Sequence, residues 1–132
     1  MFLNSSANQD YENNTFFDFT VNIPQKIDLS ENKWEIGLTE ISFISMNTIF
    51  PDMYICCDMI SPSFLGNTNL QILRYIPKSN GIYQKYFDNI FYFEVIGNSL
   101  DKIRIYINSA HDDFPSLEDS TLYCTVHLRE KK

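Results

Sequence analysis

Glycine and basic residues are scarce in this chain of 132 residues, which has four glycines and ten lysines and arginines against seventeen acidic residues. The scarcity of glycine and the lack of a sustained heptad exclude collagen-like and coiled-coil proteins. The net charge of −7 disfavours nucleic acid as a partner, because an acidic surface repels phosphates. No apolar run approaches the roughly 18 residues of a membrane-spanning helix. The first residues also lack the basic and apolar regions of a signal peptide. We therefore expect a chain made in the cytosol, with no nucleic-acid partner and no membrane span.

Cysteine is limited to three residues, Cys56, Cys57 and Cys124. An odd number without regular spacing argues against a disulfide scaffold, and no metal-ligand spacing is present. If residues 56 and 57 lie in a strand, their side chains point to opposite faces. We expect reduced thiols that serve as small buried apolar groups, and no metal site.

Aromatic residues, in contrast, make up 15% of the chain, an area that has to be hidden from water in a packed core. The length fits one domain. Residues 1–14 are polar and rich in asparagine, and we interpret them as a flexible N-terminal arm. Residues 15–132 then form a single domain.

Apolar and polar residues alternate along most of this domain, and no long segment has helical periodicity. The predicted strands span 15–23, 33–45, 53–60, 70–76, 87–96, 103–107 and 121–129. Turn signals separate them, which predicts an all-β fold, an antiparallel β-sandwich of about seven or eight strands. A single jelly roll suits that number, and an immunoglobulin-like sandwich is the alternative.

Three local signals add detail to this pattern. Pro24 should end the first strand, since proline cannot donate a hydrogen bond to a neighbouring strand. The apolar parity shifts by one residue near Thr39-Glu40, which predicts a β-bulge. The turn at Gly97-Asn98-Ser99 predicts a hairpin between the strands at 87–96 and 103–107.

Groups that could perform catalysis are dispersed along the sequence, so we predict no catalytic residue, no enzyme activity and no cofactor. Glu40 is expected to have a structural role, accepting backbone hydrogen bonds or pairing with Arg74 or Arg104. The acidic loop that contains Asp112 and Asp113 is most simply a solvated loop, and whether it binds a cation stays open.

Tyrosine is the residue type that points to a binding function. Tyr92, Tyr106 and Tyr123 fall on the parity opposite the aliphatic face of their strands, so they would form one patch if these strands were neighbours. His127 and Arg129 lie on the polar parity of the last strand. Tyrosine is favoured at interfaces because it combines a large apolar area with a polar tip. These five residues are the predicted interface candidates.

Several segments resemble small proteins of Polinton/Maverick elements, adintoviruses and related virophage-like DNA viruses. They are FTVNIP at 19–24, IDL at 27–29, WEIGLTEI at 34–41 and TLYCTVHLREKK at 121–132. The resemblance implies a non-enzymatic single jelly roll that forms a vertex, a spike or another minor capsid part. Such proteins usually form homo-oligomers or bind other virion proteins, so the expected location is the virion or the host cell interior. The alternative is a carbohydrate- or ligand-binding β-sandwich that uses tyrosines and the loop of Asp112 and Asp113.

Overall fold

The computed structural model describes residues 2–4, 18–50, 52–65, 68–109 and 121–131. All of the regular secondary structure in these residues is β-strand, which confirms the all-β prediction. The strands are β1 (Phe2–Asn4), β2 (Asp18–Asp28), β3 (Trp34–Phe50), β4 (Met53–Cys57), β5 (Ser63–Leu65), β6 (Thr68–Leu70), β7 (Ile72–Ile76), β8 (Ser79–Tyr86), β9 (Tyr92–Glu94), β10 (Ser99–Ser109) and β11 (Thr121–Glu130).

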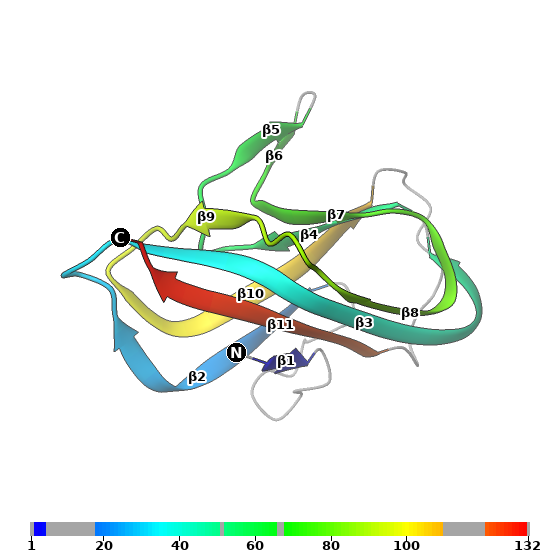
Figure 1. Cartoon of the computed structure of the whole chain (residues 1–132), viewed down its shortest axis with the longest axis horizontal. Helices are drawn as coiled ribbons and strands as arrows, with labels where there is room; N and C mark the ends of the chain where they lie inside the picture. The colour runs from blue at the N-terminus through cyan, green and yellow to red at the C-terminus, as the bar shows by residue number, and fades with distance from the viewer. Residues whose placement is uncertain (1, 5–17, 51, 66–67, 110–120, 132) are drawn as a thin grey trace.

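Two antiparallel sheets pack face to face (Figure 1). Sheet A has the strand order β1-β11-β3-β8, and β9 pairs with β3 further along the same side as β8. Sheet B has the order β2-β10-β4-β7. The short strands β5 and β6 form a separate hairpin that projects away from both sheets.

The strands pair in a nested order along the chain. β1 pairs with β11, β2 with β10, β3 with β8 and β9, and β4 with β7, and every pair is antiparallel. If β8 and β9 are counted as one interrupted strand, eight strands pair first with last and so inward to the centre. This nesting over two four-stranded sheets is a jelly roll, and it confirms the fold expected from the alternation.

The core lies between the sheets because each long strand directs every second side chain inward. Ile103 and Ile105 of β10 are fully buried, as are Leu122 and Val126 of β11. Full burial of one such aliphatic side chain stabilises the fold by about 1.5–3 kcal/mol relative to leaving it exposed. The apolar residues of the two inner faces form one continuous cluster.

The β-bulge predicted near Thr39-Glu40 is present at Thr39. Between β11 and β3 the register shifts at this residue, whose hydroxyl donates to the Thr125 carbonyl at 3.0 Å. Its own carbonyl accepts from the Phe87 N–H at 2.9 Å. The extra residue brings both Leu38 and Ile41 into the core, which explains the shift of parity in the sequence.

Pro24 does not end the first long strand, and this expectation was wrong. β2 continues to Asp28. Its pairing with β10 is interrupted for the four residues around Pro24, because the register between the two strands shifts at Asp101 of β10. β2 is also an edge strand of sheet B. Proline is tolerated here because edge strands and bulges do not require its missing N–H group.

The hairpin predicted around Gly97 is not formed. β9 belongs to sheet A and β10 to sheet B, so the turn carries the chain across the sandwich. Gly97 has a φ of 94°, a conformation that a side chain disfavours. The turn was predicted correctly and the pairing was not, because alternation has the same period whichever sheet a strand joins.

Residues 1–14 were predicted to be a flexible arm, but the structure places a strand near their start. Residues 2–4 form β1, which pairs with β11 from Tyr123 to Thr125. Residues 5–14 lie outside the described part of the chain. The polar composition of this region did not show that a segment of only three residues extends sheet A.

Candidate interaction surface

Three of the five predicted interface residues meet on the outer face of sheet A, and we call them the outer stack: Tyr92, His127 and Arg129. Tyr92 of β9 and His127 of β11 both lie opposite Gly37 of β3, one on each side. The Tyr92 side chain reaches across the glycine, and its hydroxyl lies 2.8 Å from His127 Nδ1. The middle strand therefore separates two side chains that nevertheless touch.

Gly37 makes this contact possible because it has no side chain. A Cβ atom at this position would lie 2.6 Å from Cγ2 of Ile90 and 2.8 Å from the Phe91 carbonyl oxygen. It would also lie 3.2 Å from the Tyr92 ring. Glycine within a strand often marks such a close approach. A lone glycine within a strand pattern is therefore a sequence signal for this surface, and Gly37 was not among the predicted interface residues.

Arg129 lies on top of the Tyr92 ring, with the carbon of its guanidinium 3.4 Å from the ring centroid. Its Nε donates a hydrogen bond of 2.7 Å to Glu35 Oε1, on the neighbouring strand β3. A cation over an aromatic ring contributes about 0.5–1 kcal/mol at an exposed site. The carboxylate and the ring together fix the guanidinium in one orientation while about half of the Arg129 side chain stays exposed.

Tyr123 lies on the same strand face as His127, but Tyr106 does not share this surface. Tyr123 is half-buried on β11 of sheet A, whereas Tyr106 is on β10 of sheet B. The outer faces of the two sheets point in opposite directions. The single patch of three tyrosines is therefore not formed, because Tyr106 lies on the other side of the sandwich.

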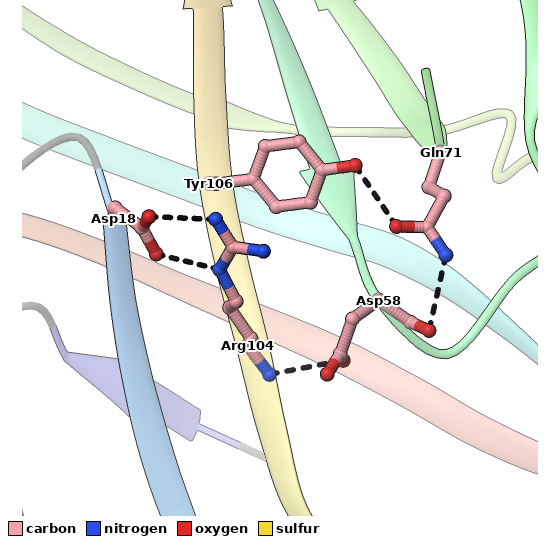
Figure 2. A network of polar contacts seen from close by, with 5 residues as sticks. All are labelled: Asp18, Asp58, Gln71, Arg104 and Tyr106. Carbon is pink, nitrogen blue, oxygen red and sulfur yellow. Dashed lines mark hydrogen bonds and ion pairs between the residues drawn. The ribbon is translucent and has the colours of Figure 1, made fainter. Parts of the chain in front are cut away.

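Tyr106 instead takes part in a polar network on sheet B, which Figure 2 shows. Its hydroxyl donates to Gln71 Oε1 at 2.9 Å, and the Gln71 amide donates to the Asp58 carbonyl at 3.2 Å. Two nitrogens of Arg104 donate to Asp18 at 2.8 and 2.7 Å. These hydrogen bonds tie β10 to β2 and to the segment after β4, so we assign the network a structural role.

Glu40 does not provide a carboxylate for Arg104, whose ion-pair partner is Asp18. Glu40 is half-buried beside the bulge, opposite Thr125 and Tyr86. Arg74, the other suggested partner, lies at the edge of the sandwich, and its Nη1 donates to the Asn89 carbonyl at 2.7 Å.

The Arg74 guanidinium is sandwiched between two aromatic rings, each with its centroid 4.1 Å away, those of Phe87 and Phe91. Burial lowers the pKa of Arg74 from its usual value. The contact joins the edge strand β7 of sheet B to the segment between β8 and β9 of sheet A. Sequence spacing gave no signal for it, because the partners come from different sheets.

Asp58 contributes a partly buried carboxyl to this network. Burial raises the pKa of this carboxyl, and the hydrogen bond from the Arg104 backbone N–H opposes the shift. A raised folded pKa means that the folded chain holds the proton more tightly than the unfolded chain. The stability from this proton is fully present below the unfolded pKa of about 3.9 and is lost as the pH rises through the folded value.

We therefore expect the Asp58→Asn variant to gain stability relative to the natural chain as the pH rises from about 3.5 to 6. Asparagine keeps an oxygen acceptor for the Arg104 N–H and avoids a buried charge. Urea denaturation of both chains across this range measures the difference in free energy of unfolding. A difference that does not depend on pH would show that the Asp58 carboxyl titrates normally.

The described residues contain no group of three or more histidine, cysteine, aspartate or glutamate side chains placed to hold a metal ion. Cys56, Cys57 and Cys124 are free and buried, as expected. Burial raises the pKa of Cys56 and Cys57 to about 12 and also raises that of Cys124, so these thiols are poor nucleophiles. Asp112 and Asp113 lie outside the described residues, so the carbohydrate alternative and cation binding stay predictions.

No family model matches the chain, and no curated protein or solved structure is significantly similar to it. The described part of the chain also contains no helix long and apolar enough to cross a membrane. The fold and the outer face of sheet A are therefore the features that bear on function.

Proposed function

We propose that this chain is a non-enzymatic structural protein of a virus or a virus-derived element, such as a minor capsid, vertex or spike jelly roll. In this proposal it works by assembly in the virion or the host cell interior. The outer face of sheet A binds further copies of the chain or other virion proteins.

The observation that carries the proposal is the ordered outer stack. Tyrosine and arginine are enriched among the residues that contribute most to binding between proteins. Here they are held in fixed orientations by Gly37, Glu35 and each other before any partner arrives. Ordering long side chains in advance reduces the entropy that association would otherwise cost.

The jelly-roll topology supports the same proposal. Viral capsid domains use this double-sheet architecture, although lectin domains and cupins use it too. Since one fold hosts many functions, the topology alone does not select among them. The resemblance of residues 19–41 and 121–132 to proteins of virus-like elements favours the viral reading.

We expect the chain to self-associate in sedimentation velocity at micromolar concentrations, and the Arg129→Glu variant to dissociate more readily. This substitution removes the cation from the Tyr92 ring and puts a second carboxylate next to Glu35. Loss of a central interface arginine typically costs about 2 kcal/mol or more, which is roughly a 30-fold weaker association.

The matched control is Lys102→Glu, which makes the same change of charge at an exposed position on sheet B. It should leave association unchanged, and circular dichroism should show both variants folded. Two results speak against the proposal: a monomer at every concentration that also binds no virion protein, or equal association of all three chains.

A further inference from the structure

In the part of the chain that the structure describes, one edge of sheet A is only partly paired. β11 spans Thr121–Glu130 and pairs with β3 along its whole length, but β1 pairs only with its residues 123–125. Among the described residues, no strand pairs with residues 127–130 on the side away from β3. On the same side of the sandwich, the edge strand of sheet B is β2, which is eleven residues long. Figure 1 shows the short β1 beside the much longer β11.

The main-chain groups of alternate residues at this edge point away from β3. The Lys131 N–H donates to the Lys33 carbonyl at 2.7 Å, so it points to the β3 side. Because N–H and C=O groups alternate between the two edges of a strand, those of Leu128 and Glu130 point away from β3. The Trp34 carbonyl agrees with this assignment. Trp34 lies opposite Glu130, and its carbonyl accepts from Val95 on the far side of β3.

Apolar side chains lie on the inner side of the same corner. Leu128 of β11 and Ile23 and Ile27 of β2 are only partly buried, although all three pack against the core. These strands form the two edges that face one another here. A further strand beside residues 127–130 would bring alternate side chains over this corner, and apolar ones would bury more surface there.

Basic side chains lie along this edge on the outer face of sheet A. His127, Arg129 and the following Lys131 alternate along it, in a chain whose net charge is −7. The acidic partners of Arg129 and Lys131, which are Glu35 and Glu94, lie on the β3 side of β11, and His127 contacts Tyr92 on that side. A strand added at the free edge would have these three basic side chains as its nearest cross-strand neighbours, about 4.5–5.5 Å away between Cβ atoms.

We propose that residues 127–130 of β11 bind an extended segment of a partner protein, in which carboxylate side chains alternate with apolar ones. The segment joins sheet A as a new edge strand. Its main chain bonds to Leu128 and Glu130, its apolar side chains cover the inner corner, and its carboxylates face His127, Arg129 and Lys131. The inference deepens the proposed function and rests on it, because it names the chemistry of a partner for the edge of the same sheet, next to the outer stack.

The test uses the whole chain and an acetylated, amidated peptide of sequence EVEVEVE, with hydrogen exchange of individual amides followed by NMR. We expect the Leu128 and Glu130 amides to exchange rapidly in the free chain and about tenfold or more slowly with saturating peptide. The same peptide with alternate backbone nitrogens methylated should give no protection, because it cannot bond along the edge.

Charge provides the second arm of the test. Arg129→Glu should weaken binding of EVEVEVE about tenfold and improve binding of KVKVKVK. The matched control, Lys85→Glu on the opposite edge strand β8, should bind both peptides as the natural chain does. The proposal is overturned if the two amides are already protected in the free chain. It is also overturned if the methylated peptide protects them, or if the two charged peptides bind equally well.

The outcome of the peptide test can be distinguished from the outcome of the assembly test. A chain that self-associates in sedimentation but shows no peptide-dependent protection contradicts only the edge proposal. A chain that binds no protein at this face in any assay but still shows protection supports the edge and contradicts the assembly function.

Discussion

Replacing Gly37 with alanine should lower the free energy of unfolding by about 1–3 kcal/mol. This direction is unusual, because alanine within a strand is ordinarily more stable than glycine by roughly 0.5–1 kcal/mol. The new Cβ would lie 2.8 Å from the Phe91 carbonyl oxygen, which is main chain and cannot rotate away. The segment before β9 would have to move off β3, and the Tyr92 ring would move with it. Chemical denaturation of the two chains measures the loss.

A double-mutant cycle separates the clash from other effects of the substitution. Ile90 provides the nearest atom to the new Cβ, at 2.6 Å, and Ile90→Ala removes it. We expect the double variant to be less destabilised than the sum of the single variants by about 1 kcal/mol, with the contact to Phe91 remaining. A Gly37→Ala chain as stable as the natural one would show that the Tyr92 ring does not lie against β3.

Phe43→Ala should have the largest effect on stability, about 3–5 kcal/mol. The Phe43 side chain is fully buried on β3, and its ring stacks on that of Tyr83 of β8 with centroids 4.9 Å apart and planes at 13°. Truncation leaves a cavity and removes the partner of the Tyr83 ring. For a domain of this size we expect the melting temperature to fall by roughly 10–20 °C.

Tyr86→Ala is the matched control because it truncates an aromatic residue on the same pair of strands. Its side chain is 62% exposed, so the change in free energy of unfolding should stay within about 0.5 kcal/mol. Phe43→Leu keeps most of the volume and gives a measurable value if Phe43→Ala does not fold. Equal losses for Phe43→Ala and Tyr86→Ala would contradict the assignment of the inner face of sheet A.

Alternation predicted most of the strands of this fold because the inner and outer faces of a sheet impose a period of two. It predicted the bulge at Thr39 for the same reason, since one extra residue is the simplest way to keep Leu38 and Ile41 both inside. It did not predict β8, the strand Ser79–Tyr86, which contains an Asn80-Gly81 pair of the kind typical of turns. Pairing with β3 outweighs this local preference.

Two of the errors, the hairpin around Gly97 and the single tyrosine patch, share one physical cause. A residue pattern shows which side chains face inward but not which of two sheets a strand joins. Tyr106 and Tyr123 both point away from the aliphatic face of their own strands, and yet they lie on opposite sides of the sandwich. Strand 87–96 was expected to pair with 103–107, and its described strand β9 joins β3 instead. The outer stack depends on this long-range pairing, so His127, Arg129 and Tyr92 were predicted individually and not as a group.

We propose that the outer face of sheet A binds another protein molecule. Photo-crosslinking from p-benzoylphenylalanine tests it most directly, with the probe in place of Tyr123 on sheet A or of Tyr75, an exposed tyrosine on sheet B. Both changes replace one aromatic ring with another. We expect crosslinks to a second copy or a virion protein from position 123 and few from position 75. Equal yields from the two positions, or none from position 123, would show that the outer face of sheet A is not the binding surface.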